Sequence, residues 1–345
     1  MLVQFMLKNV FSFKNETILD MTAIHAYKEH ESNLIDYGTK EKFLRVAAIY
    51  GANASGKSNL NLAMNFFQRI IIESLNNVDD GAETAIAKYY VPFLFENDNT
   101  QNSEFQITEI LGDYEYRYGF EYNAESIVTE WMYRKSLRTN RTAIIFERTM
   151  ETVEFGTAVR KECEVYKDQV PKETLVLSFF NKLKLKTDIF KKVYAGIMDT
   201  LVVPTDFCEN TGILDAFLPQ VIEREKGKLL EFLKAIDSGI VNIDYDSREK
   251  EIVFTTYHRG RDGKDHSLNL YNESEGTIKS ILLFIYARIA IIHNSSMFVD
   301  ELNTKLHPLL LKFIIDLFYD QDSTAQLIYT THDTTLMDKR FFRRD

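Results

Sequence analysis

The chain has 345 residues, of which 45% are hydrophobic and 27% are charged, and its formal net charge is −10. This composition is typical of a globular protein that can bury a sizeable core. The negative balance argues against a protein that coats nucleic acid or an anionic membrane through its overall charge, because such binding depends on clustered Lys and Arg. A local basic groove remains compatible with these values.

The two cysteines, Cys163 and Cys208, lie far apart and outside any metal-binding spacing, so we expect reduced thiols and no zinc site. The first ten residues lack the basic segment and long apolar stretch of a signal peptide. The longest apolar run, 281–292, contains Arg288 and is shorter than the roughly 18 residues that a membrane-spanning helix needs. The sequence therefore predicts a cytoplasmic protein without a membrane partner.

The spacing of apolar residues predicts strands over 2–13, with a turn at Lys8 and Asn9, and over 16–21. A short apolar strand over 45–50 is expected to be buried and parallel to its neighbours. A helix over 58–76 follows it, and its apolar side carries Leu60, Met64, Phe67, Ile71 and Leu75.

From residue 93 the period changes to two, which predicts an antiparallel meander over 93–131 with a turn at Gly112 and Asp113. The elements expected next are strands over 143–155, helices over 172–198 and 212–236, strands over 240–245 and 251–257, and a polar turn over 259–265. The last part of the chain predicts a helix over 276–292, a buried strand over 296–299, a helix over 307–319 and a buried strand over 325–330.

The segment 51–58 fits the pattern G-x-x-x-x-G-K-S, and it lies between a predicted strand and a predicted helix. In such a phosphate loop, backbone N–H groups surround phosphate oxygens, and glycines allow the close approach. Lys57 is expected to reach the β- and γ-phosphates and Ser58 to ligate Mg²⁺. The alternative is a chance match in a glycine-containing loop. The predicted nucleotide-binding residues are Gly51, Ala52, Asn53, Ala54, Ser55, Gly56, Lys57, Ser58 and Asn59.

An acidic pair, Asp300 and Glu301, follows the apolar strand over 296–299. The carboxyl ends of parallel strands are where open sheets place their ligands. We expect Asp300 to hold Mg²⁺ and Glu301 to polarise the attacking water. The alternative is a solvated acidic turn.

Two further segments have the position that a phosphate-binding role requires. Residues 272–277 lie just before a helix, where Ser274 and Gly276 would contact a phosphate, although helix capping by Ser274 or Thr277 explains the same pattern. His332 follows the last buried strand and would contact the γ-phosphate or the attacking water. The alternative is a structural histidine in a loop.

Together these motifs resemble the ABC-type ATPases, and among them the branch that includes the overcoming-lysogenization-defect (OLD) ATPases and related phage-defence ATPases. The resemblance rests on 8–13 (Lys-Asn-Val-Phe-Ser-Phe) as part of the first strand, 51–58 as the Walker A loop, 272–277 as the signature loop, 299–308 as the Walker B strand and D-loop, and His332 as the switch histidine. It implies an α/β fold of the ABC-ATPase-like P-loop type, with a mainly parallel core sheet, an antiparallel β subdomain and a helical insertion. It also implies that Ser274 and Gly276 face ATP bound to a second protomer.

Some positions depart from the family pattern. Asn303 stands where many relatives carry Asp, and either Gln101 or Gln106 could serve as the Q-loop glutamine. No long heptad region separates Ser58 from Ser274, which disfavours relatives with coiled-coil arms. The chain ends soon after His332, whereas relatives commonly continue from a similar Arg-Arg-Asp, so it looks trimmed or unusually short.

The changes in period near residues 90, 160 and 270 predict four parts of the chain. These are 1–90, the N-terminal part of the ATPase core with Walker A; 91–160, the antiparallel β subdomain; 161–270, the helical insertion and return strands; and 271–345, the remainder of the core.

We expect Mg²⁺-dependent ATP hydrolysis at a composite site in a homodimer or higher oligomer. Lys57, Glu301 and His332 are its expected catalytic residues. The protein would act as a switch or motor that regulates an effector, either a separate protein or a C-terminal domain, in anti-phage defence. The alternative is an ATP-gated DNA-binding clamp of the SMC-like or DNA-repair type, without long coiled-coil arms. Nucleic acid stays open as a partner through the basic runs at 134–148 and 339–344, although solvated charged faces explain both runs more simply.

Overall fold

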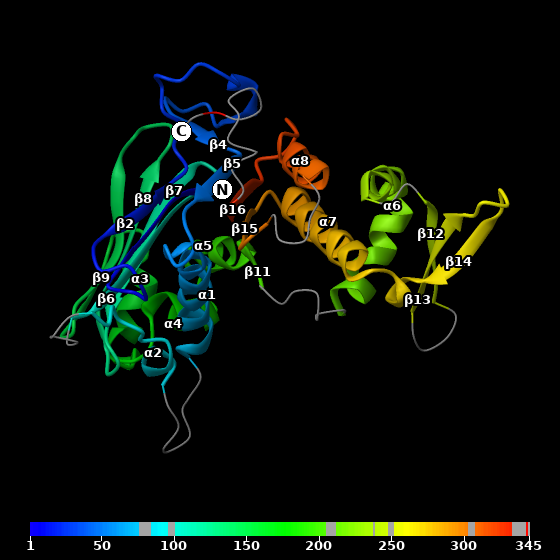
Figure 1. Cartoon of the computed structure of the whole chain (residues 1–345). Coiled ribbons are helices and arrows are strands. Elements are labelled where there is room, and N and C mark those ends of the chain that lie inside the picture. Colours follow the sequence, from blue (N-terminus) through cyan, green and yellow to red (C-terminus); the bar gives the residue numbers. More distant parts are fainter. Residues whose placement is uncertain are drawn as a thin grey trace. The chain divides into compact units, whose positions relative to one another are not determined.

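The computed structural model describes residues 1–75, 84–95, 101–204, 212–236, 239–247, 252–302, 308–332 and 343. The chain divides into two compact units, and Figure 1 labels most of their helices and strands. The first unit comprises Met1–Leu44, Ala52–Val202 and Lys339–Asp345, and the second comprises Arg45–Gly51 and Val203–Asp338. Each unit is described by itself below.

The first unit is built on antiparallel strands with helices between them. Its strands are β1 (Leu2–Lys8), β2 (Thr17–Asp20), β3 (Leu34–Asp36), β4 (Lys42–Leu44), β6 (Ser103–Leu111), β7 (Tyr114–Tyr122), β8 (Ile127–Ser136), β9 (Thr142–Arg148) and β10 (Val153–Phe155). Its helices are α1 (Lys57–Glu73), α2 (Ala85–Lys88), α3 (Arg160–Cys163), α4 (Val176–Lys182) and α5 (Ile189–Asp199), with 3-10 turns η1 (Glu31–Asn33) and η2 (Glu164–Gln169).

Seven of these strands form one sheet in the order β10-β9-β8-β7-β6-β1-β2, and every neighbouring pair is antiparallel. Alternate residues of β7 are buried, namely Tyr116, Tyr118, Phe120 and Tyr122, as the period of two predicts. Helix α1 packs on this face through Phe67, whose ring lies 5.7 Å from those of Phe5, Phe105 and Phe120. The helix that follows the phosphate loop is therefore fixed to the sheet by aromatic packing.

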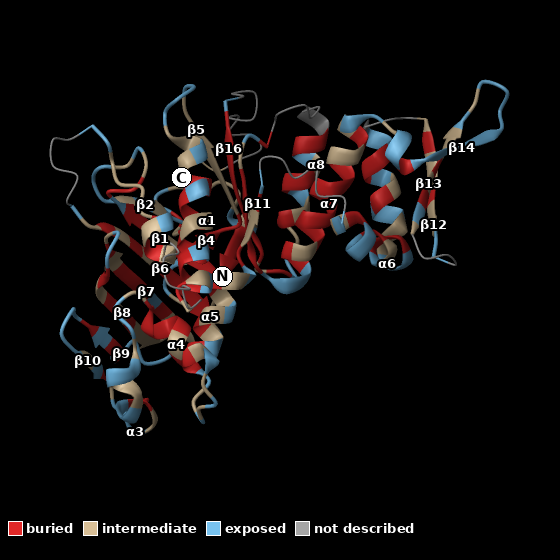
Figure 2. Cartoon of the chain, turned by 90° about the horizontal axis from the view of Figure 1, so that it is seen from below, coloured by how far each residue is buried: buried red, intermediate tan, exposed pale blue. Residues whose placement is uncertain are grey.

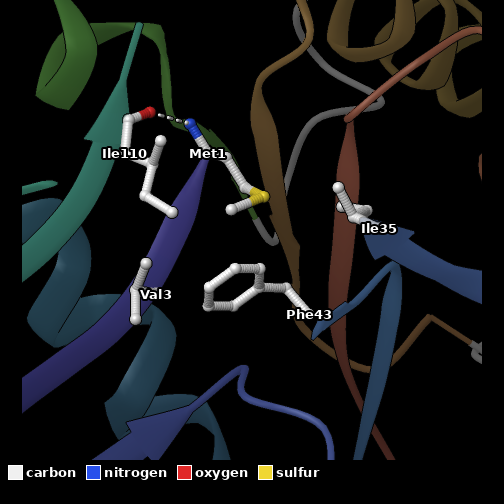
Figure 3. Packing of buried hydrophobic residues seen from close by; sticks show 5 residues of the cluster. All are labelled: Met1, Val3, Ile35, Phe43 and Ile110. Carbon is white, nitrogen blue, oxygen red and sulfur yellow. Dashed lines mark hydrogen bonds between the residues drawn. The ribbon is translucent and has the colours of Figure 1, made fainter. Parts of the chain in front are cut away.

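A smaller cluster joins this sheet to the two-stranded sheet of β3 and β4. Figure 3 shows its five buried residues, Met1, Val3, Ile35, Phe43 and Ile110. The amino group of Met1 donates a hydrogen bond to the Ile110 carbonyl oxygen at 3.2 Å. The cluster anchors the N-terminal strand, because Val3 of β1 and Met1, the residue directly before β1, pack there against residues of β3, β4 and β6.

Over its described residues, the second unit contains a parallel sheet, a three-stranded antiparallel sheet and three α-helices. Its elements are β5 (Val46–Tyr50), β11 (Leu201–Val203), α6 (Gly212–Ile236), β12 (Ile240–Asp246), β13 (Val253–Arg259), β14 (Asp265–Asn269), the 3-10 turn η4 (Leu270–Asn272), α7 (Glu275–His293), β15 (Ser296–Val299), α8 (Pro308–Phe318) and β16 (Gln326–Thr331). Strand β11 includes the boundary between the units.

The parallel sheet has the order β11-β15-β16-β5, and β16 pairs in parallel with both β15 and β5. Strands β15 and β16 are buried along their whole length, whereas β5 is half-buried. The sequence predicted a buried strand at β5. The difference follows from its position at the edge of the sheet.

Helix α7 lies in the core of the second unit, and most of its residues from Ser280 to Ile291 are buried and red in Figure 2. It is the one helix of the described residues that is long and apolar enough to span a membrane, and 67% of its most apolar window is buried inside the structure. A buried core helix meets the same criterion. Phe232 of α6 lies 5.1 Å from Phe284 of α7 and 5.2 Å from Phe313 of α8, so the three helices share one aromatic contact.

The fold is α/β, as expected, but the expectation of a mainly parallel core sheet is wrong. The largest sheet is the seven-stranded antiparallel one, because β1 pairs with β6 across about a hundred residues and extends the predicted meander. Sequence periodicity identifies strands but not such distant pairing. The parallel pairing is confined to the four-stranded sheet.

Two of the predicted elements also need correction. The first strand expected over 2–13 ends at Lys8, where the turn was expected. The second strand does not form, because 9–13 make a turn in which Asn9 and Phe11 have left-handed backbones, with φ of 52° and 51°. The helix over 172–198 is two helices, α4 and α5. Between them the Glu162 carboxylate accepts hydrogen bonds from the backbone N–H groups of Lys186 and Thr187, which favours a break in the helix.

Candidate functional site

The carboxyl ends of three parallel strands bring several predicted residues to one edge of a sheet. In the second unit, Gly51 follows β5, His332 follows β16 and Asp300 follows β15. The register aligns Tyr50 with Thr331 and Val299 with Tyr329. The start of the phosphate loop, the acidic pair and the histidine therefore lie at the same edge, which is where open sheets of this kind bind ligands.

The phosphate loop reaches α1 through a glycine in a left-handed conformation. Gly56, with φ of 93°, is the residue before the helix, and Ala54 is also left-handed, with φ of 62°. A Cβ atom at Gly56 would lie 2.7 Å from the Ser12 hydroxyl oxygen, which is closer than such atoms approach. Glycine is thus required here both by the backbone angle and by the available space.

The first turn of α1 suits an anion. No side chain caps this helix, and its first turn contains no acidic residue. The first N–H groups of a helix and its positive dipole end attract negative charge. The Lys57 ammonium group donates a hydrogen bond to the Ala52 carbonyl oxygen at 2.9 Å, so it lies against the phosphate loop.

The turn before β2 touches the same loop. The Asn59 side-chain amide donates a hydrogen bond to the Ser12 hydroxyl oxygen at 2.9 Å. Asn9 fixes this turn, because its amide group donates to the Gln101 carbonyl oxygen at 2.7 Å and its side-chain oxygen accepts from the Phe93 N–H at 3.0 Å. Ser12 was not among the predicted site residues, although it belongs to the 8–13 motif that carried the resemblance.

A second unpredicted residue, Thr330, organises the acidic pair. Its hydroxyl group donates to the Asp300 carboxylate at 2.5 Å and accepts from the Glu301 N–H at 2.8 Å. The Leu302 N–H donates to the Thr330 carbonyl oxygen at 3.1 Å. Glu301 has a left-handed backbone, with φ of 46°, and an exposed side chain. Non-glycine residues in this region are uncommon and are often found at functional sites.

The segment 272–277 lies elsewhere in the second unit. Ser274 caps α7, since its hydroxyl oxygen accepts a hydrogen bond from the Thr277 N–H at 3.1 Å, and Glu275 lies in the first turn. Figure 1 shows this end of α7 beside β13, at the opposite end of the helix from the connection to β15. Nineteen helical residues span about 28 Å, so Ser274 and the acidic edge are separated within the chain.

Gly276 has no structural reason to be glycine in the isolated chain. Its φ is not left-handed, and a Cβ atom there would have only an ordinary contact, 3.8 Å from the Ser274 hydroxyl oxygen. Glycine in a helix costs up to about 1 kcal/mol relative to alanine.

The structure says less about the roles of the predicted switch histidine, D-loop residue and Q-loop glutamine. His332 is exposed, and Asn303 lies outside the described residues. Gln106 accepts a hydrogen bond from the Trp131 indole N–H at 3.1 Å, and the Gln101 carbonyl oxygen accepts from Asn9. Neither interaction selects one of them as the Q-loop glutamine.

In each unit the residues present have the chemistry that a phosphate ligand with Mg²⁺ needs. In the first unit, the uncapped start of α1, the left-handed Gly56 and the nearby Lys57 form a cradle that a Cβ atom at Gly56 would obstruct. Mg²⁺ prefers oxygen ligands. Ser58 of the first unit offers a hydroxyl oxygen, and Asp300 of the second offers a carboxylate oxygen.

A protein-family model described as "AAA domain, putative AbiEii toxin, Type IV TA system" matches residues 46–338. No curated protein gives a significant match.

Solved structures similar to this chain include three SMC head domains, each 12% identical, with 98% of this chain and 91% of the other chain covered. One is bound to the C-winged helix domain of ScpA, with a TM-score of 0.48. One is from Thermotoga maritima, with a TM-score of 0.43. One, derived from Pyrococcus furiosus, has an extended coiled coil and is bound to the C-terminal domain of ScpA, with a TM-score of 0.43. Likeness at this level bears on neither activity nor partners.

Proposed function

Because the chain belongs to this AAA-domain family, we propose that it is a Mg²⁺-dependent ATPase whose nucleotide site is completed by a second copy of the same chain. The observation that carries the proposal is the shared edge of β5, β16 and β15, where the phosphate loop begins, the acidic pair follows and His332 emerges. Three predicted motifs thus lie at one edge of a sheet, which supports a shared nucleotide site over separate chance matches.

Each side chain has a role that its surroundings support. Gly51, Ala52, Asn53, Ala54, Ser55, Gly56, Lys57, Ser58 and Asn59 would hold the phosphates, with Lys57 neutralising charge on the β- and γ-phosphates. Ser58 and Asp300 would ligate Mg²⁺, which supplies positive charge at the phosphates when bound. Glu301 would orient the attacking water, and the contact between Thr330 and its N–H fixes the left-handed backbone that presents it.

The second copy is proposed because the signature loop, residues 272–277, is remote from the acidic edge of its own chain. Gly276 lacks an intrachain reason to be glycine, which supports a need for close approach by something outside the chain. Ser274 and Gly276 would then contact the γ-phosphate of ATP on the partner. ATP should favour the dimer and hydrolysis should loosen it.

The experiment is light scattering of Glu301→Gln with and without MgATP. This substitution keeps the shape of the side chain but removes the carboxylate, so we expect retained ATP binding, loss of most turnover and an ATP-dependent dimer. Adding Ser274→Arg should abolish the dimer and spare nucleotide binding. A monomer under both conditions would refute the composite site, and a dimer that survives Ser274→Arg would refute the role of the signature loop.

The biological role we propose is that of a switch or motor in the OLD-like branch, which regulates an effector in cytoplasmic anti-phage defence. The family description, which refers to a toxin of a toxin–antitoxin system, supports a defence role. Expression of Lys57→Ala in place of the natural chain in the native host should raise the plating efficiency of phages that the host restricts. Unchanged plating on all phages tested would contradict this role.

The ATP-gated DNA clamp ranks second because three of the basic side chains that favoured it, Arg134, Arg148 and Arg343, are engaged within the first unit. Arg148 is buried and donates to the carbonyl oxygens of Thr174 and Pro171, and Arg134 stacks on the Tyr114 ring at 4.4 Å. Arg343 donates to three backbone carbonyl oxygens in 24–29. Salt-dependent DNA binding by the purified chain would favour the clamp.

A further inference from the structure

Hydrogen bonds and a buried leucine fix successive residues of the connection between β14 and α7. The Asn269 side-chain oxygen accepts from the Tyr271 N–H at 2.9 Å, and the Glu273 N–H donates to the Leu270 carbonyl oxygen at 3.0 Å. Leu270 is fully buried, and Ser274 caps the helix that follows. The chain therefore enters the signature loop along a defined path.

Glu273, the residue immediately before Ser274, fastens this path to β13. Its side chain is 6% exposed, and its Oε1 atom lies 2.6 Å from Nε2 of His258, whose ring N–H can donate to it. The same oxygen accepts a hydrogen bond from the hydroxyl group of Thr256, which is fully buried. Both donors are in the middle of the three-stranded sheet.

A buried carboxylate is costly unless hydrogen-bond donors compensate for the lost water. Capping of α7 does not need Glu273, because Ser274 supplies the cap. The carboxylate instead adds a fixed point one residue before the side chain that would meet the γ-phosphate. Its two partners, His258 and Thr256, belong to a sheet that contains no residue of the phosphate loop or the Walker B strand.

We propose that Glu273 is a positioning residue for the composite site, and that it acts through His258 and Thr256 to hold the signature loop in the orientation that a second, ATP-bound copy accepts. This inference rests on the proposed two-protomer ATPase and deepens it. On this inference, the dissociation constant of the ATP-dependent dimer depends on the contacts of Glu273 with the three-stranded sheet. The nucleotide affinity of the phosphate loop does not depend on them.

The test compares Glu273→Ala, His258→Ala and the double variant in the Glu301→Gln background. The dissociation constant of the MgATP dimer, measured by sedimentation or light scattering, should rise about tenfold for Glu273→Ala, which corresponds to about 1.4 kcal/mol. If Glu273 acts through His258, the double variant should be no weaker than the weaker single variant. Affinity for MgADP, which lacks the γ-phosphate, should stay within twofold of the parent.

Two controls separate positioning from general damage. Asp262→Asn removes a carboxylate from the turn between β13 and β14, where Asp262 lies 3.1 Å from the exposed His266, and it should leave the dimer unchanged. Glu273→Gln keeps an acceptor oxygen and should restore most of the affinity lost in Glu273→Ala. If Glu273→Ala does not fold, Thr256→Val and His258→Ala carry the test, since each removes a donor and leaves the carboxylate.

A dimer constant within twofold of the parent in Glu273→Ala, or in both donor variants, would overturn this inference and leave the ATPase proposal intact. A loss of MgADP affinity equal to the loss of dimer affinity would overturn it too, because the defect would then not be specific to closure. Failure of Glu301→Gln itself to dimerise with MgATP would instead refute the proposed composite site.

Discussion

Replacement of Thr330 by valine tests the organisation of the acidic pair. Valine keeps the branched shape at this fully buried position but removes the hydroxyl that joins the Asp300 carboxylate to the Glu301 N–H. A hydrogen bond to a charged group contributes about 1.5–3 kcal/mol. If that energy holds Glu301 in its catalytic position, kcat should fall about tenfold to a hundredfold, since each 1.36 kcal/mol is about a factor of ten. Steady-state ATPase kinetics measure kcat, and titration calorimetry with MgADP should show affinity within threefold of the natural protein.

Thr330→Ser is the matched control, because it keeps the hydroxyl and loses only a methyl group. It should retain kcat within about threefold, while its loss of thermal stability should be similar to that of Thr330→Val or greater. The reasoning is refuted if Thr330→Val turns over ATP within twofold of the natural rate while it remains folded. Equal losses of kcat in both variants would mean that packing matters here and the hydroxyl does not.

Two other substitutions are expected to keep or raise the stability of the folded protein. Gly276→Ala should leave the thermal stability unchanged or raise it by up to about 1 kcal/mol, because the added Cβ meets only an ordinary contact. The same substitution should abolish the MgATP dimer of Glu301→Gln. A dimer of natural strength would refute the close approach at Gly276. Burial raises the pKa of Glu109 from 4.5 to about 7, so the folded state holds a proton that the unfolded state releases, and stability should fall by about 3 kcal/mol as the pH rises from 4.5 to 7. Glu109→Gln should remove most of this slope in denaturant titrations at several pH values and be the more stable protein at pH 8; an unchanged slope would assign the pH dependence to other groups.

The phosphate loop could be predicted because its chemistry is contiguous in sequence. Residues 51–58 combine the two glycines, the lysine and the serine within eight positions, and the strand before them and the helix after them follow from local periodicity. The acidic pair and His332 could be predicted for a similar reason, since each follows an apolar strand. Ser12 and Thr330 could not, because their contacts depend on elements that are distant in the chain. Thr330 meets Asp300 only through the parallel pairing of β15 and β16, and Ser12 meets Asn59 only because 9–13 fold into a strained turn.

The largest sheet was misjudged for the same physical reason. The alternation of residues in β6 and β7 is a local signal, and the hairpin between them was expected. The pairing of β1 with β6 is not local, and neither strand's sequence contains information about its partner. The break between α4 and α5 was missed because one carboxylate, that of Glu162, holds backbone N–H groups outside either helix. Apolar periodicity gives no weight to such side-chain contacts with the backbone.

The capping and phosphate-binding interpretations of Ser274 are compatible, although the sequence presented them as alternatives. A serine hydroxyl has one proton to donate and two lone pairs to accept with. The cap uses one lone pair, which accepts from the Thr277 N–H at 3.1 Å. The Thr277 hydroxyl lies 2.9 Å away and can donate to Ser274 as well, which leaves the Ser274 proton available for an oxygen outside the chain. The cap also restricts the rotation of the side chain, so this proton has a defined direction. A phosphate of ATP on the second copy could therefore be bound without the loss of the cap, and closure of the dimer would not have to offset a destabilised α7.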